Sequence, residues 1–338
     1  LLERAGAPVA SRLACPDGRR VLTLAGTESE TMAVGLEAHV APAGERSAVY
    51  NDVSATAIDA MKAKGAVSLL QHTERWTPEQ IASLPVDGFE MFNLHALTLR
   101  EAVRASDLLN RVILKDEGLP APDLALLGFL SEDPRYLSTW GTVLARGARR
   151  VTTLGTDCHR NTFPPLMSDG ERVDSYRRMM SWFSNHLLVK PKADGTFDDR
   201  DLKEALRAGR LYGAFELVGT PEGFDARAET AGGVGELGSE VRLSDAPVIV
   251  ASMPGVKNLD PKRGKPLLTL RLLKAKEGGW DEVASGDRDL RFAPTSPGAY
   301  RVEVRMVPRH LREDLNDDAD VVLARDLVWI YANPFYVR

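Results

Sequence analysis

The sequence predicts an α/β protein in which a mainly parallel sheet or barrel comes first and a smaller β-rich domain follows. Two observations predict this class. From about residue 19 to residue 215, short apolar runs alternate with helical stretches, which is the pattern of βα units. After about residue 222, short β-type runs follow one another between Gly, Asp and Pro. We place the boundary between residues 222 and 245, and take 1–225 and 226–338 as the two domains.

The predicted elements of the first domain are bounded by local signals. "LLERAGAP" at the start has the form of a last helical turn with Gly6 just beyond it. An amphipathic helix over 54–65 is opened by Ser54 and closed by Gly65. The runs that we interpret as strands are 19–26, 66–72, 88–93 and 149–156.

Three further helices are predicted from their first turns. Thr77 is followed by proline and then, three positions after Thr77, by glutamine, which is the signature of a capping box. Asp133 and Pro134 open a helix that ends near Gly147. The segment 198–215 has an acidic helix start, a stop at Gly209 and then another strand.

The second domain contains four β-type runs, and their spacing predicts a small antiparallel β-sandwich. The runs are "APVIVASM", "PLLTLRLLK", "AYRVEVRMV" and "DLVWIYA". The glycine-rich stretch 228–240 precedes them. Its Gly233, Gly235 and Gly238 match G-x-G-x-x-G, but no helical pattern follows, so we predict a flexible linker here and no dinucleotide site.

Composition excludes several classes of partner. The net charge is −5 and no long basic run occurs, so we expect neither nucleic acid nor an anionic membrane as the main partner. No apolar stretch approaches the ~20 residues of a spanning helix. Cys15 and Cys158 are too few for a zinc ribbon or a disulfide scaffold, and we expect two unpaired thiols. Cys158 alternates with its neighbours along a strand and is expected to pack in the interior.

Polar residues gather where the predicted strands end. His72, Glu90, Asn93, Asp157 and His159 all lie at or just after such ends, and Glu28 and His39 follow the first strand. In βα folds the carboxyl ends of the strands carry the chemistry. One carboxylate and two imidazoles suit Zn, Mn or Fe. Taken singly, each histidine also fits a hydrogen-bonded structural role, and Asp157 also fits a turn or a helix cap.

The order of these residues resembles the PHP family, named for its polymerase and histidinol phosphatase members. The resemblance covers about residues 15–225. It rests on Gly26-Thr27-Glu28, on the two histidines that follow, on "DGFEMFN", on "GTDCH" and on "LKEALRAGRLYGAF". The tail, "PGAYRVEVR…VWIYANPFYVR", also resembles the β domain that follows some bacterial PHP domains.

The resemblance implies a distorted seven-stranded β/α barrel, with one to three metal ions at its mouth. Glu28 would bridge two ions, with His39 and His72 completing the second site. Asp157 would belong to the first site and His159 to the third, so that Glu28, Asp157 and His159 form the catalytic set. The resemblance also places a group of substrate-binding or supporting residues near the mouth, namely Glu90, Asn93, His95, Arg160 and Asn161.

The sequence departs from the family at its beginning. PHP proteins start with a strand that carries His-x-His, whereas the histidines here are at 39, 72, 95, 159, 186 and 310. The first two barrel strands would also be missing. Because the chain begins with leucine, we expect that an upstream segment of the same protein is absent from this sequence. The alternative is a reduced PHP variant. His186 and His310 match no family motif and are expected to be structural.

The predicted function is a metal-dependent hydrolase, foremost a phosphoesterase that uses a metal-bridging hydroxide as the nucleophile. The alternatives are a carboxyl or carbamate ester hydrolase of the same fold and a non-catalytic binding module. The expected partner is a small-molecule phosphate or ester. A barrel with an attached β domain fits an exported bacterial protein, and retained thiols fit the cytosol equally well.

Overall fold

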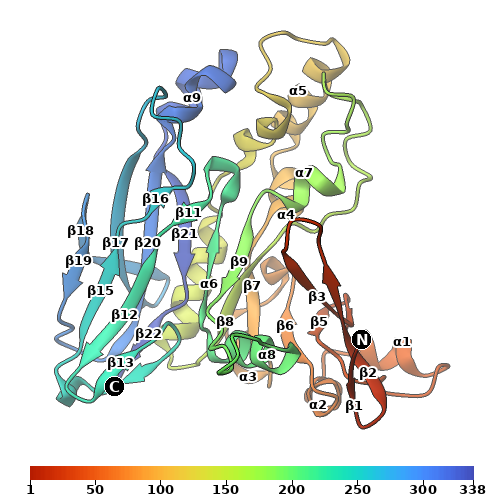
Figure 1. Cartoon of the computed structure of the whole chain (residues 1–338), viewed down its shortest axis with the longest axis vertical. Coiled ribbons are helices and arrows are strands. Elements are labelled where there is room, and N and C mark those ends of the chain that lie inside the picture. Colours follow the sequence, from red (N-terminus) through yellow and green to blue (C-terminus); the bar gives the residue numbers. More distant parts are fainter.

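The structure, a computed structural model, describes residues 1–338 and has a mixed α/β fold (Figure 1). Its strands form five sheets, and none of these sheets closes on itself. The α/β class predicted from the sequence is therefore confirmed, whereas no closed barrel is present. None of the helices is both long and apolar enough to cross a lipid bilayer.

The central sheet has five strands in the order β4-β5-β6-β7-β8. Their bounds are β4 Gly26–Thr27, β5 Thr31–Val34, β6 Val67–Leu70, β7 Gly88–Asn93 and β8 Val151–Gly155. Strands β6, β7 and β8 run parallel, while β4 and β5 join antiparallel. The prediction of a mainly parallel sheet thus holds for three strands. These three are buried along nearly their whole length, as parallel strands covered on both faces must be.

The helices around this sheet begin where their first turns predict. The Ser54 hydroxyl accepts a hydrogen bond from the Ala57 N–H at the start of α2, and Thr77 and Gln80 form a complete capping box on α3. Asp133 caps α6, the helix that packs against β7 and the C-terminal strands. The helices are α1 Arg46–Tyr50, α2 Ala55–Ala63, α3 Pro78–Ser83, α4 Leu94–Arg100, α5 Ala102–Ile113, α6 Pro134–Ala145, α7 Tyr176–Met180, α8 Asp199–Ala208 and α9 Ala319–Leu323.

The N-terminal segment is a β-hairpin, and its prediction as the end of a helix is wrong. Strand β1 (Leu2–Arg4) pairs antiparallel with β2 (Ala7–Ala14), which pairs in turn with β3 (Arg20–Leu24). Ala5 and Gly6 both have positive φ angles, of 49° and 77°. A two-residue turn of that kind matches the twist of antiparallel strands, so Gly6 serves a turn here and not a helix end.

An ionic cluster fastens this hairpin to α8. Arg4 contacts Asp199 at 2.9 Å, and the buried Lys203 ammonium lies 3.1 Å from Asp199 and 2.8 Å from Glu37. Lys203 also donates a hydrogen bond to the Gly35 carbonyl. The side chains of Asp199 and Lys203 are 1% and 3% exposed, which is tolerable for charges only when they are paired in this way.

The remaining strands belong mostly to one eight-stranded sheet and one four-stranded sheet. The first has the order β14-β22-β20-β21-β10-β9, with β17 added to β20 and β18 to β17. The second has the order β13-β12-β15-β19. A separate two-stranded sheet consists of β11 Pro221–Glu222 and β16 Gly255–Val256. The strands of the two larger sheets are β9 Ser184–Leu187, β10 Leu211–Ala214, β12 Asp225–Thr230, β13 Gly233–Gly235, β14 Glu240–Val241, β15 Val248–Ser252, β17 Leu267–Lys276, β18 Gly279–Gly286, β19 Leu290–Phe292, β20 Gly298–Val307, β21 Leu327–Ala332 and β22 Phe335–Val337.

Strands from both sides of residue 225 share the large sheet. β10 pairs antiparallel with β21, with Tyr212 opposite Ala332. One hydrophobic core of 62 buried residues extends from Ala33 to Val337. The four predicted β-runs are present as β15, β17, β20 and β21, divided between the two sheets. The division into 1–225 and 226–338 stays a prediction.

Side-chain amides join the central sheet to the large sheet. The Asn333 side chain accepts a hydrogen bond from the Thr152 N–H and donates one to the Thr152 carbonyl, each at 2.9 Å. Asn185 of β9 bonds to the N–H and the carbonyl of Leu154 in the same manner, each at 3.0 Å. These two amides therefore satisfy the free edge of β8.

The glycine-rich stretch is ordered, and its prediction as a flexible linker is wrong. Strands β12 and β13 form a hairpin across it. A Cβ atom at Gly238 would lie 1.8 Å from the Ala208 carbonyl oxygen, so glycine allows the chain to pack against the end of α8. After the three glycines the chain continues into β14 and a single 3-10 turn at Leu243–Asp245, and it forms no α-helix there.

Candidate metal centre

Asp157 lies at the centre of a group of three histidines, just beyond the end of β8. Its Oδ2 atom is 3.1 Å from His95 Nδ1 and 3.7 Å from His72 Nε2, while its Oδ1 atom contacts His159 Nε2. The Asp157 side chain is 6% exposed. Its backbone has a positive φ of 51°, an uncommon conformation for a residue other than glycine, and this turn aims the carboxylate at the histidines.

Three of these residues lie close enough together that they could hold a metal ion. One ligand atom from each of His95, Asp157 and His159 lies within 4.8 Å of the others. Two atoms bound to one zinc ion at about 2.1 Å are at most about 4.2 Å apart, so small side-chain rotations suffice. The donor set of two imidazoles and one carboxylate is typical of Zn, Mn or Fe.

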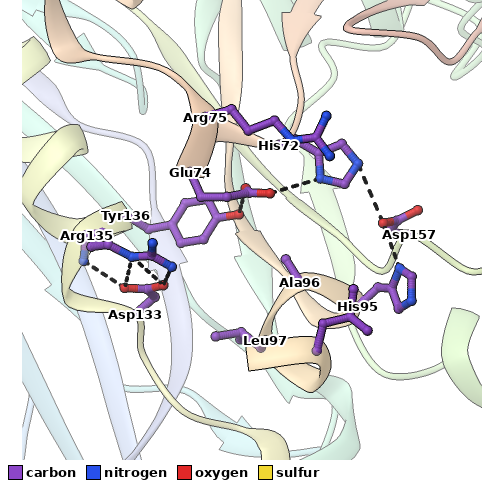
Figure 2. A pocket seen from close by; sticks show the side chains of 11 residues that line it. His72, Glu74, Arg75, His95, Ala96, Leu97, Asp133, Arg135, Tyr136 and Asp157 are labelled. Carbon is purple, nitrogen blue, oxygen red and sulfur yellow. Dashed lines mark hydrogen bonds and ion pairs between the residues drawn. The ribbon is translucent and has the colours of Figure 1, made fainter. Parts of the chain in front are cut away.

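His72 approaches the same carboxylate from the end of β6. Its own φ is 50°, again positive, and its Nδ1 atom is 3.1 Å from Glu74 Oε1. The Tyr136 hydroxyl donates a hydrogen bond to the other oxygen of Glu74. As Figure 2 shows, Glu74 thus lies between Tyr136 and His72, and the opposite ring nitrogen of His72 faces Asp157. A metal-binding histidine is commonly oriented through its second nitrogen in this way.

Glu90 of β7 lies beneath the centre and is 4% exposed. Its Oε2 atom accepts hydrogen bonds from Asn93 Nδ2 at 3.0 Å and from the His72 N–H at 3.3 Å. Burial raises the pKa of Glu90 to about 7, and the nearby carboxylates of Asp157 and Glu74 add to the effect. A Cβ atom at Gly155 would lie 1.6 Å from Glu90 Oε1, so glycine at this position leaves room for the buried carboxyl group.

The charges at the centre favour an ionised Asp157. Burial opposes ionisation of Asp157, but the hydrogen bond from His95 and the electrostatic interaction with the three imidazoles lower its pKa below the usual value. Asp157 therefore offers a carboxylate to a cation at neutral pH. Asn93 supports the geometry by capping α4, since its side chain accepts a hydrogen bond from the Ala96 N–H.

A cavity of about 220 Å³ opens beside the histidines, and it is lined by both charged and apolar groups. Asp157, His72 and His95 form one wall, and Arg75, Arg135 and Tyr136 lie around the remainder (Figure 2). Arg75 has a long ion pair with Glu30, of 3.4 Å, and its side chain is 59% exposed. Arg135 is held by Asp133 at 2.9 Å. The cavity is large enough for a small polar molecule.

Two of the predicted ligands lie outside this centre. Glu28 is exposed at the end of β4 and forms no hydrogen bond or ion pair within the chain. His39 is exposed in the loop after β5, where its Nδ1 atom is 3.3 Å from the Tyr50 hydroxyl. The structure thus brings together His72, Asp157 and His159 of the predicted metal set, and their binding of metal stays a prediction, as does that of Glu28 and His39.

The weaker candidates have separate places. His95, predicted near the substrate, is part of the centre itself. Arg160 is exposed beside His159 and forms no ion pair, whereas Asn161 accepts a hydrogen bond from the Thr162 hydroxyl at 3.1 Å. Cys158 packs against the core, and burial raises the pKa of its thiol.

The two histidines outside the family motifs have structural contacts. His186 stacks on Tyr212 with ring centroids 4.7 Å apart and contacts Glu216 at 3.0 Å. His310 is buried and hydrogen-bonds through Nε2 to the Val218 carbonyl.

Glu74 and Tyr136 are the residues that sequence reasoning missed. Glu74 follows His72 by two positions, and a carboxylate so close to a candidate ligand is a signal that can be read from the sequence. Tyr136 comes from α6 and is 62 positions away from Glu74, so no local pattern connects the two.

In comparisons with known proteins, no family model, no curated protein and no solved structure matches this chain.

Proposed function

We propose that His95, Asp157 and His159 bind a divalent transition-metal ion, with His72 as a further ligand, and that the chain is a metal-dependent hydrolase. The observation that carries the proposal is the position of one buried carboxylate, Asp157, within reach of three imidazoles. This donor set, at the carboxyl ends of parallel strands and beside a cavity, fits a catalytic zinc, manganese or iron site.

An ion bound there would activate a water molecule as the nucleophile and offset the charge on the leaving oxygen. The residues of the chain have the remaining tasks. Glu74 and Tyr136 hold the imidazole of His72 in one orientation. Arg75 and Arg135 place positive charge on the wall of the cavity, where an anionic substrate would lie.

The composition of the cavity favours a phosphoester over a carboxyl ester. A phosphate group has charged oxygens that guanidinium groups bind well, and Arg75, whose one ion pair is long, lines the cavity together with Arg135, which is paired with Asp133. The apolar part of the lining, from Ala96, Leu97 and Leu99, is on one side. A carboxyl or carbamate ester hydrolase remains the second candidate reaction for the same residues.

We further propose that the segment from β4 to β10 corresponds to part of a PHP-type barrel. Support comes from the order of Glu28, His39, His72, Asp157 and His159 along the chain and from the three parallel strands that end at the centre. The alternative of a non-catalytic, PHP-type binding module is favoured by one observation, namely that Glu28 and His39 make no contact with the centre.

The test is the metal content of the purified protein, measured by elemental analysis after incubation with Zn or Mn and desalting. We expect about one equivalent in the wild type and a marked loss in Asp157→Asn and His159→Ala. His186→Ala is the matched control, because His186 lies outside the centre, and it should retain metal. Equal metal content in all four proteins, or none in the wild type, would show the proposal to be wrong.

Hydrolysis is tested separately on the metal-loaded protein. p-Nitrophenyl phosphate, bis-p-nitrophenyl phosphate and p-nitrophenyl acetate distinguish the monoester, diester and carboxyl ester reactions. Turnover of a phosphate ester that is lost in Asp157→Asn supports a phosphoesterase. Metal binding without turnover of any of the three would instead support the binding module.

A further inference from the structure

A second cavity lies at the opposite end of the parallel strands. Its volume is about 340 Å³, and Arg149, Arg150 and Arg207 line it together with Asp87 and Tyr336. Arg149 and Arg150 directly precede β8, whereas Asp157 follows it, so about one strand length separates this cavity from the candidate metal centre. In Figure 1 this is the lower end of the sheet, where α3 and α8 lie.

The positive charge in this cavity is poorly compensated. Asp87 is its one carboxylate, and that group is already paired with Lys62 at 3.2 Å. Arg149 has a single distant carboxylate partner, Glu240, at 3.9 Å, and Arg150 and Arg207 have none. Burial lowers the pKa of Arg150, although the charges of Tyr336 and Asp87 partly oppose this. The negative end of α8 is nearby, but a helix end contributes about half a charge and cannot balance three guanidinium groups.

The three arginines are held in place, and Arg149 and Arg207 still have nitrogens without an acceptor. Arg150 donates through all three of its guanidinium nitrogens, to the carbonyls of Arg149, Ile81, Ala82 and Leu84, which fixes it against the end of α3. Arg207 uses only Nη2, towards the carbonyls of Gly65 and Ala66, so its Nε and Nη1 atoms have no acceptor.

Arg149 is fixed in a similar way. It donates through Nη2 to the Gly238 carbonyl, and its guanidinium lies over the Tyr336 ring, 4.9 Å from the centroid. Its Nε atom has no acceptor. An anion-binding site requires N–H donors that are held in a fixed orientation and have no other acceptor.

We propose that this cavity, lined by Arg149, Arg150 and Arg207, is a binding site for a phosphate group, separate from the candidate metal centre. A phosphate dianion accepts several charge-assisted hydrogen bonds and would neutralise the cluster. The volume exceeds that of phosphate alone, so a small phosphorylated organic molecule also fits. This inference does not depend on the proposed hydrolase activity.

The test is calorimetric titration of the whole protein with inorganic phosphate and, in a second series, with glucose 6-phosphate. We expect Arg207→Gln and Arg149→Gln each to weaken phosphate binding by about tenfold, the usual effect of losing one charged hydrogen bond. Arg207→Lys keeps the charge but loses the fork geometry, so intermediate binding is expected. Thermal melting of each variant establishes that it is folded, and the Arg149 and Arg207 variants serve as independent tests.

Arg200→Gln is the matched control, because Arg200 lies on the same helix and its side chain makes no hydrogen bond or ion pair. It should bind phosphate as the wild type does. Tighter binding of the sugar phosphate than of phosphate would identify a phosphorylated metabolite as the ligand, and equal binding would identify free phosphate. Absence of binding at millimolar phosphate, or equal affinity in all the arginine variants, would overturn the proposal. So would loss of binding in Asp157→Asn alone, since the anion would then be bound at the metal centre.

Discussion

The Nδ1 atom of His72 lies 3.1 Å from the carboxylate of Glu74, while its Nε2 atom faces Asp157. The orientation of one proposed ligand therefore depends on a residue that does not itself reach the centre. Such supporting carboxylates often change metal affinity by about 10- to 100-fold when they are removed.

Glu74→Gln should accordingly weaken zinc binding by at least about tenfold, because the neutral amide holds the imidazole less firmly. Tyr136→Phe should give a smaller loss. Competition with a chromophoric chelator measures the affinity. Glu79→Gln is the control, since Glu79 is an exposed glutamate whose partner is Arg146, away from the centre. Unchanged affinity in Glu74→Gln would mean that His72 is not a ligand.

Gly155→Ala should destabilise the fold by about 1–3 kcal/mol, as overpacking of an interior does. The new methyl group would be 1.6 Å from Glu90 Oε1, and Glu90 is too deeply buried to move aside freely. Urea unfolding measures the loss. Gly44→Ala, at a position with open space around it, should change the free energy of unfolding by less than about 0.5 kcal/mol. Similar values for the two variants would contradict the packing seen at Glu90.

His310 should make the fold less stable in mild acid. Burial, together with the nearby Arg263, lowers the pKa of His310 in the folded chain below the usual 6.5, although the hydrogen bond to Val218 and the charge of Asp314 partly oppose this. Its Nδ1 atom is buried without a hydrogen-bond partner, so a second proton has no acceptor. Below pH 6.5 the unfolded chain takes up a proton that the folded chain does not. The free energy of unfolding then falls by up to about 1.4 kcal/mol per pH unit.

This effect of His310 is measured by urea unfolding of the wild type and His310→Gln between pH 8 and pH 5. The difference in unfolding free energy should be constant above pH 7 and should shift in favour of the variant as the pH falls. Other titrating groups are common to both proteins and cancel in the difference. A constant difference over the whole range would rule out a neutral, buried His310.

Asn333→Leu should cost about 2–4 kcal/mol of unfolding free energy. It removes the two short hydrogen bonds to the Thr152 backbone and a longer one to the Leu211 carbonyl, and it leaves the N–H and carbonyl of Thr152 buried without the Asn333 amide. Asn333→Asp keeps the acceptor but loses the donor, and should also destabilise the fold. Asn161→Leu, in an exposed loop, is the control. Chemical denaturation compares the three, and a loss of less than about 0.5 kcal/mol in Asn333→Leu would contradict the role of this amide.

The features that the sequence predicted correctly depend on residues that are close together in the chain. Ser54, Thr77 and Asp133 cap their helices through side-chain hydrogen bonds to backbone N–H groups within three residues, so short patterns suffice to locate the helix starts. The closeness of His72, Asp157 and His159 could also be expected, because parallel strands end at one edge of a sheet.

What the sequence could not predict depends on distant partners. The first strand, 19–26, has the apolar pattern of a sheet strand, but it pairs with an N-terminal hairpin that requires positive φ at Ala5 and Gly6. A glycine-rich run is read as a linker unless the surface that covers it is known, and here that surface is the end of α8. Glu28 and His39 precede and follow β5, but the loops that hold them keep both exposed.

The pairing of β10 with β21 has a consequence for how the chain is made. Tyr212 leaves the ribosome long before its partner Ala332, so at first one edge of β10 has unpaired N–H and carbonyl groups. Contacts of such long sequence separation slow folding and leave apolar strands exposed in the meantime. The large sheet can therefore be completed only after β21 and β22 have been synthesised, and until then the unpaired edge of β10 is open to pairing with a strand of another chain.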